Sequence, residues 1–187
     1  MAENGRDEVQ ALRRIIEITG LLNSTLNLDE LLQLIMSSAT DLLHAETSSL
    51  LLLDEEANDL VIHTATGESG EQVAKQRVPA GQGIAGWVLQ HNEPAIVENA
   101  KEDPRFYAGM DDATGFETRN VLALPLKVRD RIVGVVEVIN KRDGKFTDTD
   151  RELADALANQ AAIAIDNAQL YAKLADAVVT SRMSYRL

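Results

Sequence analysis

The C-terminal segment is the feature of this sequence that most limits how the chain can fold. Residues 147–187 contain neither glycine nor proline, and "TDTDRE" at their start supplies a capping residue and first-turn acids. An apolar stripe at helical spacing predicts one helix of about eight turns, carried by Leu153, Leu157, Gln160, Ala164, Ala168, Tyr171, Leu174 and Val178. A helix of that length exceeds the needs of a small domain. We therefore expect it to lead to a further domain, or the chain to be a piece of a longer protein.

Two helical patterns precede the middle of the chain. The first, near residues 7–22, has the spacing of a short coiled-coil seam, at Val9, Leu12, Ile16 and Thr19. The second is predicted to begin after Asn27, which can cap it, with Glu30 three residues on. Its apolar residues share one face of the helix: Leu28, Leu31, Leu32, Ile35, Ala39, Leu42 and Leu43.

Between these helices the pattern changes to short extended runs bounded by turn residues. Strands are predicted at "TSSLLLLD", "DLVIHTAT", "VAKQRVP", "EPAIVE", "NVLALPLKV" and "RIVGVVEVIN". The turn "EEAN" links the first two runs, and "RD" links the last two into an antiparallel hairpin. We therefore predict an α+β fold, with an antiparallel sheet and its helices grouped on one face.

Charge and composition exclude several classes of function. A formal net charge of −12 argues against a nucleic-acid-binding surface and against docking on an anionic membrane. The chain has no cysteine, which excludes disulfides, thiolate metal sites, cysteine nucleophiles and thioether-linked pigments. The three histidines match no metal-ligand spacing and have no evident catalytic partner, so we expect neither a metal nor an enzyme active site. With a polar N-terminus and no apolar run near the ~20 residues that span a bilayer, the chain is expected to be cytoplasmic.

Two segments are candidates for binding a small anion. "GQGIAG" at 81–86 is typical of a glycine turn that opens a helix, whose free N–H groups can bind a phosphate. The alternative is a close-packed strand-to-helix turn. "FYAGMDDATGFETRN" at 106–120 is polar and shows neither helical nor strand periodicity. We interpret it as a lid over the ligand, because long non-periodic loops in compact domains are usually functional; a solvated acidic loop is the alternative.

Individual side chains fit this interpretation. Within 106–120, Asp111 and Asp112 are acceptors suited to sugar hydroxyls, while Thr114 and Thr118 can donate or accept. Tyr107 offers a ring face to a base and a hydroxyl to a phosphate. Outside that segment, strand alternation places Glu137 between apolar neighbours, where a carboxylate needs a partner from a ligand or the backbone.

Two long segments of the sequence resemble a known family. "GQGIAGWVLQHNEPAIVENAKEDPRFYAGMDDATGFETRNVLALPL" and "GVVEVINKRDGKFTDTDRE" resemble the GAF domains that bind cyclic nucleotides in phosphodiesterases and cyanobacterial adenylyl cyclases. The resemblance extends from about Leu28 to Tyr171. It implies a GAF fold, with long terminal helices on one face of the sheet and a ligand lid on the other. It divides the chain into a signalling helix at 1–26, a ligand-binding domain at 27–171 and an exit helix at 172–187.

The resemblance also implies a structural clamp. The family motif is an Asn-Lys pair, then a phenylalanine, then Asp-Glu, and here it is matched by Asn140, Lys141, Phe146 and Asp150. The next residue is Arg151, so the motif's glutamate is displaced by one position. By the resemblance, Lys141 and Asp150 form an ion pair that holds the lid.

Family ligand contacts carried over by matched position imply one pocket. Its residues are Ser49, Ala65, Thr66, Ile84, Ala85, Tyr107, Asp111, Thr114, Thr118 and Glu137. Backbone N–H groups of Ile84 and Ala85 would meet the cyclic phosphate. Guanine-specific members carry an aromatic residue and an acid where this chain has Ala65 and Thr66, which favours cAMP over cGMP. His63 and Arg77 are further candidates for reaching the base.

The function implied is a regulatory sensor that binds a cyclic nucleotide and signals through its terminal helices, in a homodimer, to an output domain in the same polypeptide. A catalytic output domain is compatible with this function, whereas this segment is expected to be a regulatory binding domain and not an enzyme. One alternative is a ligand-free GAF module for dimerisation or spacing. Others are a GAF sensor for a different small molecule and haem binding through a histidine.

Overall fold

The computed structural model describes residues 10, 14, 28–68 and 70–184. All but two positions of the helix expected at 1–26 lie outside the described residues, as does its whole apolar seam at Val9, Leu12, Ile16 and Thr19. Among the helices of the described part, none combines the length and apolar character needed to cross a membrane.

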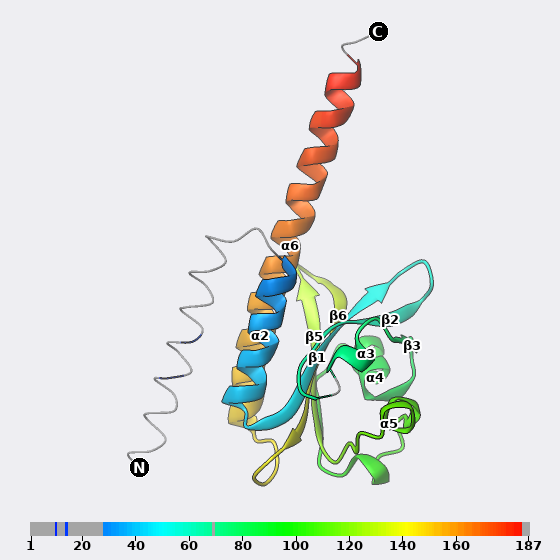
Figure 1. Ribbon diagram of the computed structural model, residues 1–187, viewed down its shortest axis with the longest axis vertical. Helices are drawn as coiled ribbons and strands as arrows, with labels where there is room; N and C mark the ends of the chain where they lie inside the picture. Colours follow the sequence, from blue (N-terminus) through cyan, green and yellow to red (C-terminus); the bar gives the residue numbers. More distant parts are fainter. Residues whose placement is uncertain (1–9, 11–13, 15–27, 69, 185–187) are drawn as a thin grey trace.

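A six-stranded antiparallel sheet forms the centre of the domain, with strand order β3-β2-β1-β6-β5-β4 (Figure 1). The strands are β1 (Ala45–Asp54), β2 (Asp59–Ala65), β3 (Arg77–Pro79), β4 (Ala95–Val97), β5 (Val121–Val128) and β6 (Arg131–Lys141). Both hairpins expected from the turn residues are present, because β1 pairs with β2 and β5 pairs with β6. The α+β prediction is confirmed.

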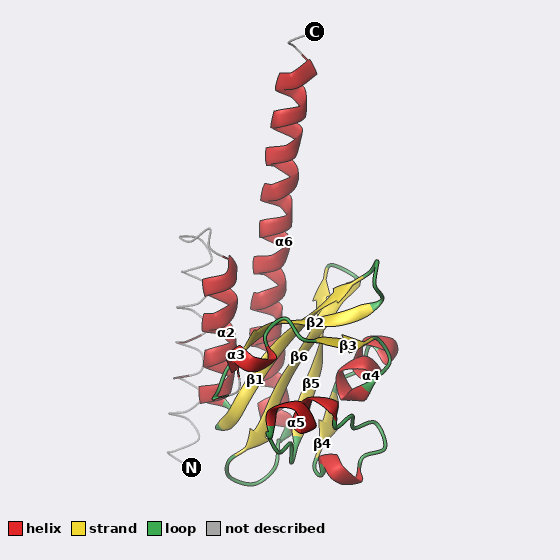
Figure 2. Cartoon of the chain, turned by 45° about the vertical axis from the view of Figure 1, so that its right-hand side comes forward, coloured by secondary structure: helices red, strands yellow, loops and turns green. Residues whose placement is uncertain are grey.

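Two long helices cover one face of the sheet: α2 (Leu28–Leu42) and α6 (Asp148–Ser184), which lie side by side in Figures 1 and 2. The core between helices and sheet is aliphatic and includes the fully buried side chains of Leu32, Ile35, Met36, Leu43, Leu50, Leu122, Leu124, Leu126 and Leu157. The first half of α6 packs on the sheet, whereas the rest projects beyond the domain (Figure 1). α6 passes the expected boundary at 171–172 without a break.

Short helices lie over the opposite face (Figure 2): α3 (Gly70–Val73), α4 (Gly83–His91), η1 (Ala100–Glu102) and α5 (Gly109–Thr114). Gly81 and Gly83 have φ angles of +89° and +70°, which glycine adopts without strain, so the glycine turn leads directly into α4. α4 ends at Asn92, in the left-handed region, whose N–H donates to the Val88 carbonyl.

Two local predictions were wrong. The strand expected over "VAKQRVP" is limited to Arg77–Pro79, because Val73 ends α3 and Lys75 takes a positive φ of 68° that breaks an extended run. The segment at 106–120, interpreted as non-helical, contains α5. Gly115 ends this helix with a φ of 71° and donates its N–H to the Asp111 carbonyl.

Candidate ligand-binding site

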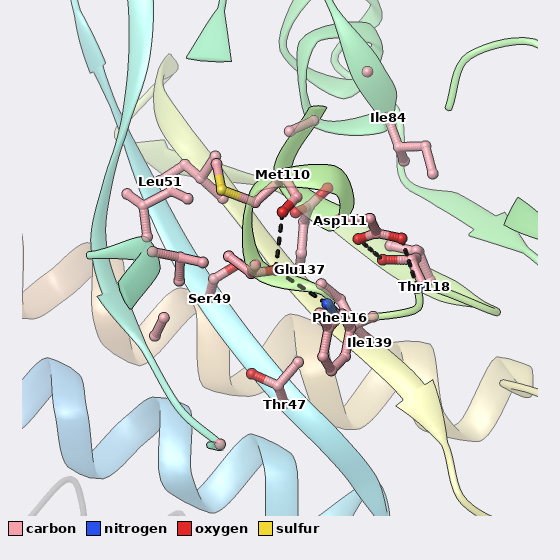
Figure 3. Close-up of a pocket in the computed structure, with 18 of the residues that line it drawn as sticks. Thr47, Ser49, Leu51, Ile84, Met110, Asp111, Phe116, Thr118, Glu137 and Ile139 are labelled. Carbon is pink, nitrogen blue, oxygen red and sulfur yellow. Dashed lines mark hydrogen bonds between the residues drawn. The ribbon is translucent and has the colours of Figure 1, made fainter. Parts of the chain in front are cut away.

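A cavity of about 420 Å³ lies between the sheet and the helices α4 and α5 (Figure 3). Its volume falls within the range of small-molecule sites, and its wall is mainly apolar with a few polar groups. All ten predicted ligand-binding residues border it: Ser49, Ala65, Thr66, Ile84, Ala85, Tyr107, Asp111, Thr114, Thr118 and Glu137. Their contact with a ligand remains a prediction.

The start of α4 supplies backbone donors to this cavity. Gly86 makes the first hydrogen bond of the helix, to the Gln82 carbonyl at 3.1 Å. The N–H groups of Ile84 and Ala85, in the turn before it, have no acceptor among the described residues. The side chain of Gln82 makes no capping hydrogen bond. This end of α4 therefore offers free donors and the positive end of a helix dipole to an anion.

The segment interpreted as a lid is closed by its own hydrogen bonds (Figure 3). Thr118 donates to both carboxylate oxygens of Asp111, from its backbone N–H and its hydroxyl, each at 2.7 Å. The Thr114 hydroxyl donates to the Met110 carbonyl at 2.9 Å. The Asp111–Thr118 bonds thus hold α5 against the segment that leads into β5, whereas the Thr114 bond stays within α5. Each of these residues would exchange or share its bonds on contacting a ligand. Tyr107, 49% exposed, lies at the rim of the cavity.

Glu137 lies on the sheet floor of the cavity without a partner. Its carboxyl group has no hydrogen bond or ion pair with any described residue. Burial raises the pKa of Glu137 to about 7. A carboxyl group enclosed among apolar neighbours such as Leu51 and Ile139 is therefore available to a ligand that offers hydrogen-bond donors.

The predicted role of Thr66 is corrected by the structure. Thr66 borders the cavity, but its hydroxyl lies on the α2 side of the sheet, 2.7 Å from the hydroxyl of Thr40. It also accepts the backbone N–H of Ser48 at 2.9 Å. Because Ala65 faces Ser49 across the strand pair, alternation turns the next side chain to the other face. The Thr66 hydroxyl is therefore engaged and cannot distinguish adenine from guanine.

The four residues of the family motif, Asn140, Lys141, Phe146 and Asp150, do not form one clamp on the lid. They make two separate sets of contacts. Lys141 Nζ lies 3.0 Å from Asp150 and donates to the Leu43 carbonyl at 3.0 Å, with Phe146 buried beside it. Asp150 in turn accepts the Thr147 N–H at 2.8 Å, at the start of α6. This ion pair joins β6 to α6, and neither of its side chains bonds to the lid among the described residues, contrary to the prediction; Lys141 meets the lid through its backbone N–H, which donates to the Asn120 side chain at 2.8 Å.

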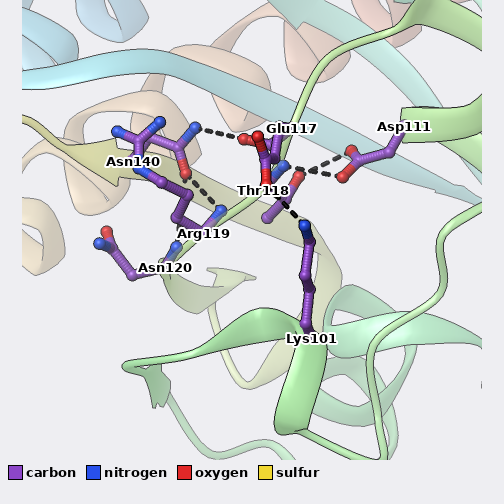
Figure 4. A network of polar contacts seen from close by, with 7 residues as sticks. All are labelled: Lys101, Asp111, Glu117, Thr118, Arg119, Asn120 and Asn140. Atoms are coloured by element: carbon purple, nitrogen blue, oxygen red, sulfur yellow. Dashed lines mark hydrogen bonds and ion pairs between the residues drawn. The ribbon is translucent and has the colours of Figure 1, made fainter.

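Asn140 is the motif residue that holds the lid (Figure 4). Its fully buried amide accepts the Arg119 N–H at 2.7 Å and donates to the Glu117 carbonyl at 2.8 Å, where the lid joins β5. It also donates to Glu46 at 2.9 Å. Asn140 has a φ of 60°, a conformation that asparagine tolerates better than most residues.

Sequence reasoning missed two ion pairs made by the lid residues Glu117 and Arg119. Glu46 forms an ion pair with Arg119 at 2.7 Å, and the hydrogen bonds from Arg119 and Asn140 hold the pKa of Glu46 below its usual range despite burial. Nearby, Lys101 pairs with Glu117 at 2.6 Å across the lid (Figure 4), which raises the pKa of the lysine. No local pattern signals such pairs, because their members lie far apart in sequence.

The described residues can be searched for side chains that would bind haem or a metal ion. None of the three histidines borders the cavity. Among the described residues, no group of three or more histidine, aspartate or glutamate side chains is arranged to hold a metal ion.

A curled antiparallel sheet with two long helices on one face and a cavity on the other defines an α+β domain with a candidate small-molecule site. A family model described as "GAF domain" matches residues 25–166. The chain belongs to the GAF domain family.

Its relatives include cyclic nucleotide phosphodiesterases. The chain is 30% identical over 176 residues to a probable 3',5'-cyclic phosphodiesterase, pde-5, of Caenorhabditis elegans, covering 89% of this chain and 24% of that protein. It is 29% identical over 188 residues to the dual 3',5'-cyclic-AMP and -GMP phosphodiesterase 11 of Drosophila melanogaster, covering 92% of this chain and 13% of that protein. The chain therefore spans a quarter or less of these relatives.

Solved structures support the fold. The GAF domain from a phosphoenolpyruvate-protein phosphotransferase of Coxiella burnetii matches with a TM-score of 0.78 at 23% identity, covering 87% of this chain and 96% of that one. Free methionine-R-sulfoxide reductase from Neisseria meningitidis matches with a TM-score of 0.73 at 17% identity, covering 86% and 91%. At these identities the likeness concerns the fold alone.

Proposed function

We propose that this domain is a regulatory sensor that binds a purine cyclic nucleotide, cAMP or cGMP, in the cavity beneath α5. The observation that carries the proposal is the pairing of free N–H groups at the start of α4 with an unpartnered carboxyl group at Glu137, in one cavity of about 420 Å³. The first suits an anion and the second suits a base with N–H donors. The two phosphodiesterase relatives support this ligand class.

The proposed phosphate contact at the start of α4 can be tested by adding a negative charge beside it. Gln82→Glu places a carboxylate at the start of α4, where it favours the helix dipole but repels a bound phosphate. We expect cAMP and cGMP affinities, measured by calorimetry, to fall about tenfold or more, with thermal stability unchanged or slightly higher.

Asn159→Asp is the matched control for this experiment. It adds the same charge on an exposed position of α6, away from the cavity, and should leave affinity unchanged. Absence of heat and of any thermal shift with either nucleotide at millimolar concentration would contradict the proposed function.

The signalling part of the proposal concerns α6. This helix keeps large apolar side chains exposed, most of them beyond the sheet: Ile163, Leu170, Tyr171, Leu174, Val178 and Val179. Ile163, Leu170 and Leu174 lie on one side of the helix by their spacing. We propose that they pair with the same helix of a second copy, in the cytoplasm, and pass a ligand-dependent change to an output domain. A ligand can cause such a change only if it binds two arrangements of the paired helices with different affinities.

Charged substitutions on the side of α6 that carries Ile163, Leu170 and Leu174 should separate the two copies of the proposed dimer. We expect Leu170→Lys with Leu174→Lys to convert a dimer into a monomer in light scattering after size exclusion, because buried lysines would face each other. Ala172→Lys, on the opposite side of the helix, is the control and should leave the dimer intact. A wild-type protein that is monomeric at high micromolar concentration would remove this part of the proposal.

A further inference from the structure

Two side chains on the cavity floor are left without partners inside the protein. Ser49 on β1 lies directly opposite Glu137 on β6, so both side chains point from neighbouring strands to the same face (Figure 3). Neither side chain has a hydrogen bond with any described residue. Ser49 is only 8% exposed, and Glu137 is half-buried.

The other polar side chains of the cavity wall differ from this pair. Those within the wall are bonded inside the protein: Glu46, Thr47, Thr66, Asp111, Thr114 and Thr118. Those whose side chains make no hydrogen bond with a described residue are exposed at the rim: Glu68, Gln82, Tyr107 and Arg142. Ser49 and Glu137 are thus the enclosed polar groups that a ligand can satisfy.

Resting on the proposed function, we propose that Glu137, beside Ser49, selects the base, and that its protonation state decides which purine is bound. A neutral carboxyl group is one O–H donor and one C=O acceptor. That pair matches adenine, which accepts at N1 and donates from its N6 amine. An ionised carboxylate is acceptor-only and matches guanine, which donates from N1–H and from its N2 amine. The hydroxyl of Ser49 can donate or accept, so it supports either base.

The surroundings of Glu137 leave both states accessible near neutral pH. Four charged or acidic groups line the cavity from other parts of the chain: Glu46, Glu68, Asp111 and Arg142. None of them pairs with Glu137, and burial is the cause of its raised pKa, about 7. Among the described residues that line the cavity, which include no histidine, Glu137 has a pKa raised toward neutral pH. A ligand that binds one protonation state loses apparent affinity in proportion to the fraction of protein in the other state.

The test is the ratio of cAMP to cGMP affinity as a function of pH. Between about pH 6 and about pH 8 the neutral fraction of a group with a pKa near 7 falls about tenfold. We expect cAMP affinity to fall by up to about tenfold over this range and cGMP affinity to rise by a similar factor. Calorimetric titrations of the wild-type domain with each nucleotide give both values.

Glu137→Gln is the matched variant, because its amide keeps one donor and one acceptor and does not titrate. Its ratio of cAMP to cGMP affinity should therefore be independent of pH. Ser49→Ala should weaken both nucleotides and leave the pH dependence in place. A wild-type ratio that is constant with pH, or a pH dependence that persists in Glu137→Gln, would overturn the inference while the proposed function stands. Failure of both nucleotides to bind at any pH would instead overturn the proposed function.

Discussion

Lys141→Met is expected to lower the free energy of unfolding by about 3–5 kcal/mol, the usual cost of removing one partner of a buried ion pair. The side chains of Lys141 and Asp150 are 13% and 11% exposed, so neither charge can be solvated in place of its partner. Loss of the lysine also leaves the Leu43 carbonyl without its 3.0 Å donor. Urea unfolding followed by circular dichroism measures the change.

Lys145→Met is the control for this prediction. Lys145 lies a few residues after Lys141 and pairs with Glu98, but the side chains of this pair are 65% and 61% exposed. Exposed pairs contribute about 0–1 kcal/mol, so this variant should remain close to wild type. Equal effects of the two lysine substitutions would show that the Lys141 pair does not join β6 to α6 as described.

Glu137→Gln is expected to make the ligand-free domain more stable at alkaline pH, by up to about 3 kcal/mol, since each pH unit of a pKa change corresponds to about 1.4 kcal/mol. The folded-state pKa of Glu137 is raised from 4.5 to about 7. Between these values the folded protein binds the proton more tightly than the unfolded chain does. Its contribution to stability is therefore fully present below about pH 4.5 and is lost as pH rises through about 7.

This prediction is measured as the difference in unfolding free energy between Glu137→Gln and wild type across that pH window. The difference should be smallest at and below about pH 4.5, grow as pH rises between the two pKa values, and level off above about pH 8. A difference that is flat with pH would mean that Glu137 titrates as an ordinary solvated glutamate. A stabilising substitution at this cavity residue would fit the proposed ligand contact, because function and stability compete at binding sites.

Local signals in the sequence located much of the site. The glycine turn at 81–86 predicted the start of α4, because positive φ angles and free N–H groups are local properties. The cap at Thr147 also follows from neighbours in sequence, since Asp150 and Thr147 exchange hydrogen bonds at 3.2 and 2.8 Å. Alternation likewise placed Glu137 on the face that lines the cavity.

Other parts of the site could not be read from local patterns. α5 is six residues long, less than two turns, so no periodicity distinguishes it from a loop. The network around Asn140 depends on partners 21 to 94 residues away, Arg119 and Glu46. Thr66 was assigned with Ala65 by matched position, although consecutive strand residues point to opposite faces.

The continuity of α6 has a geometric consequence for any attached domain. A helix of 37 residues is about 55 Å long, and each residue turns it by about 100°. α6 is anchored at its start by the ion pair between Lys141 and Asp150, and no proline or glycine interrupts it. A small rotation of its anchored end about the helix axis would therefore turn the far end by the same angle. If a unit is attached there, the rotational position of α6, more than its length, would set the orientation of that unit.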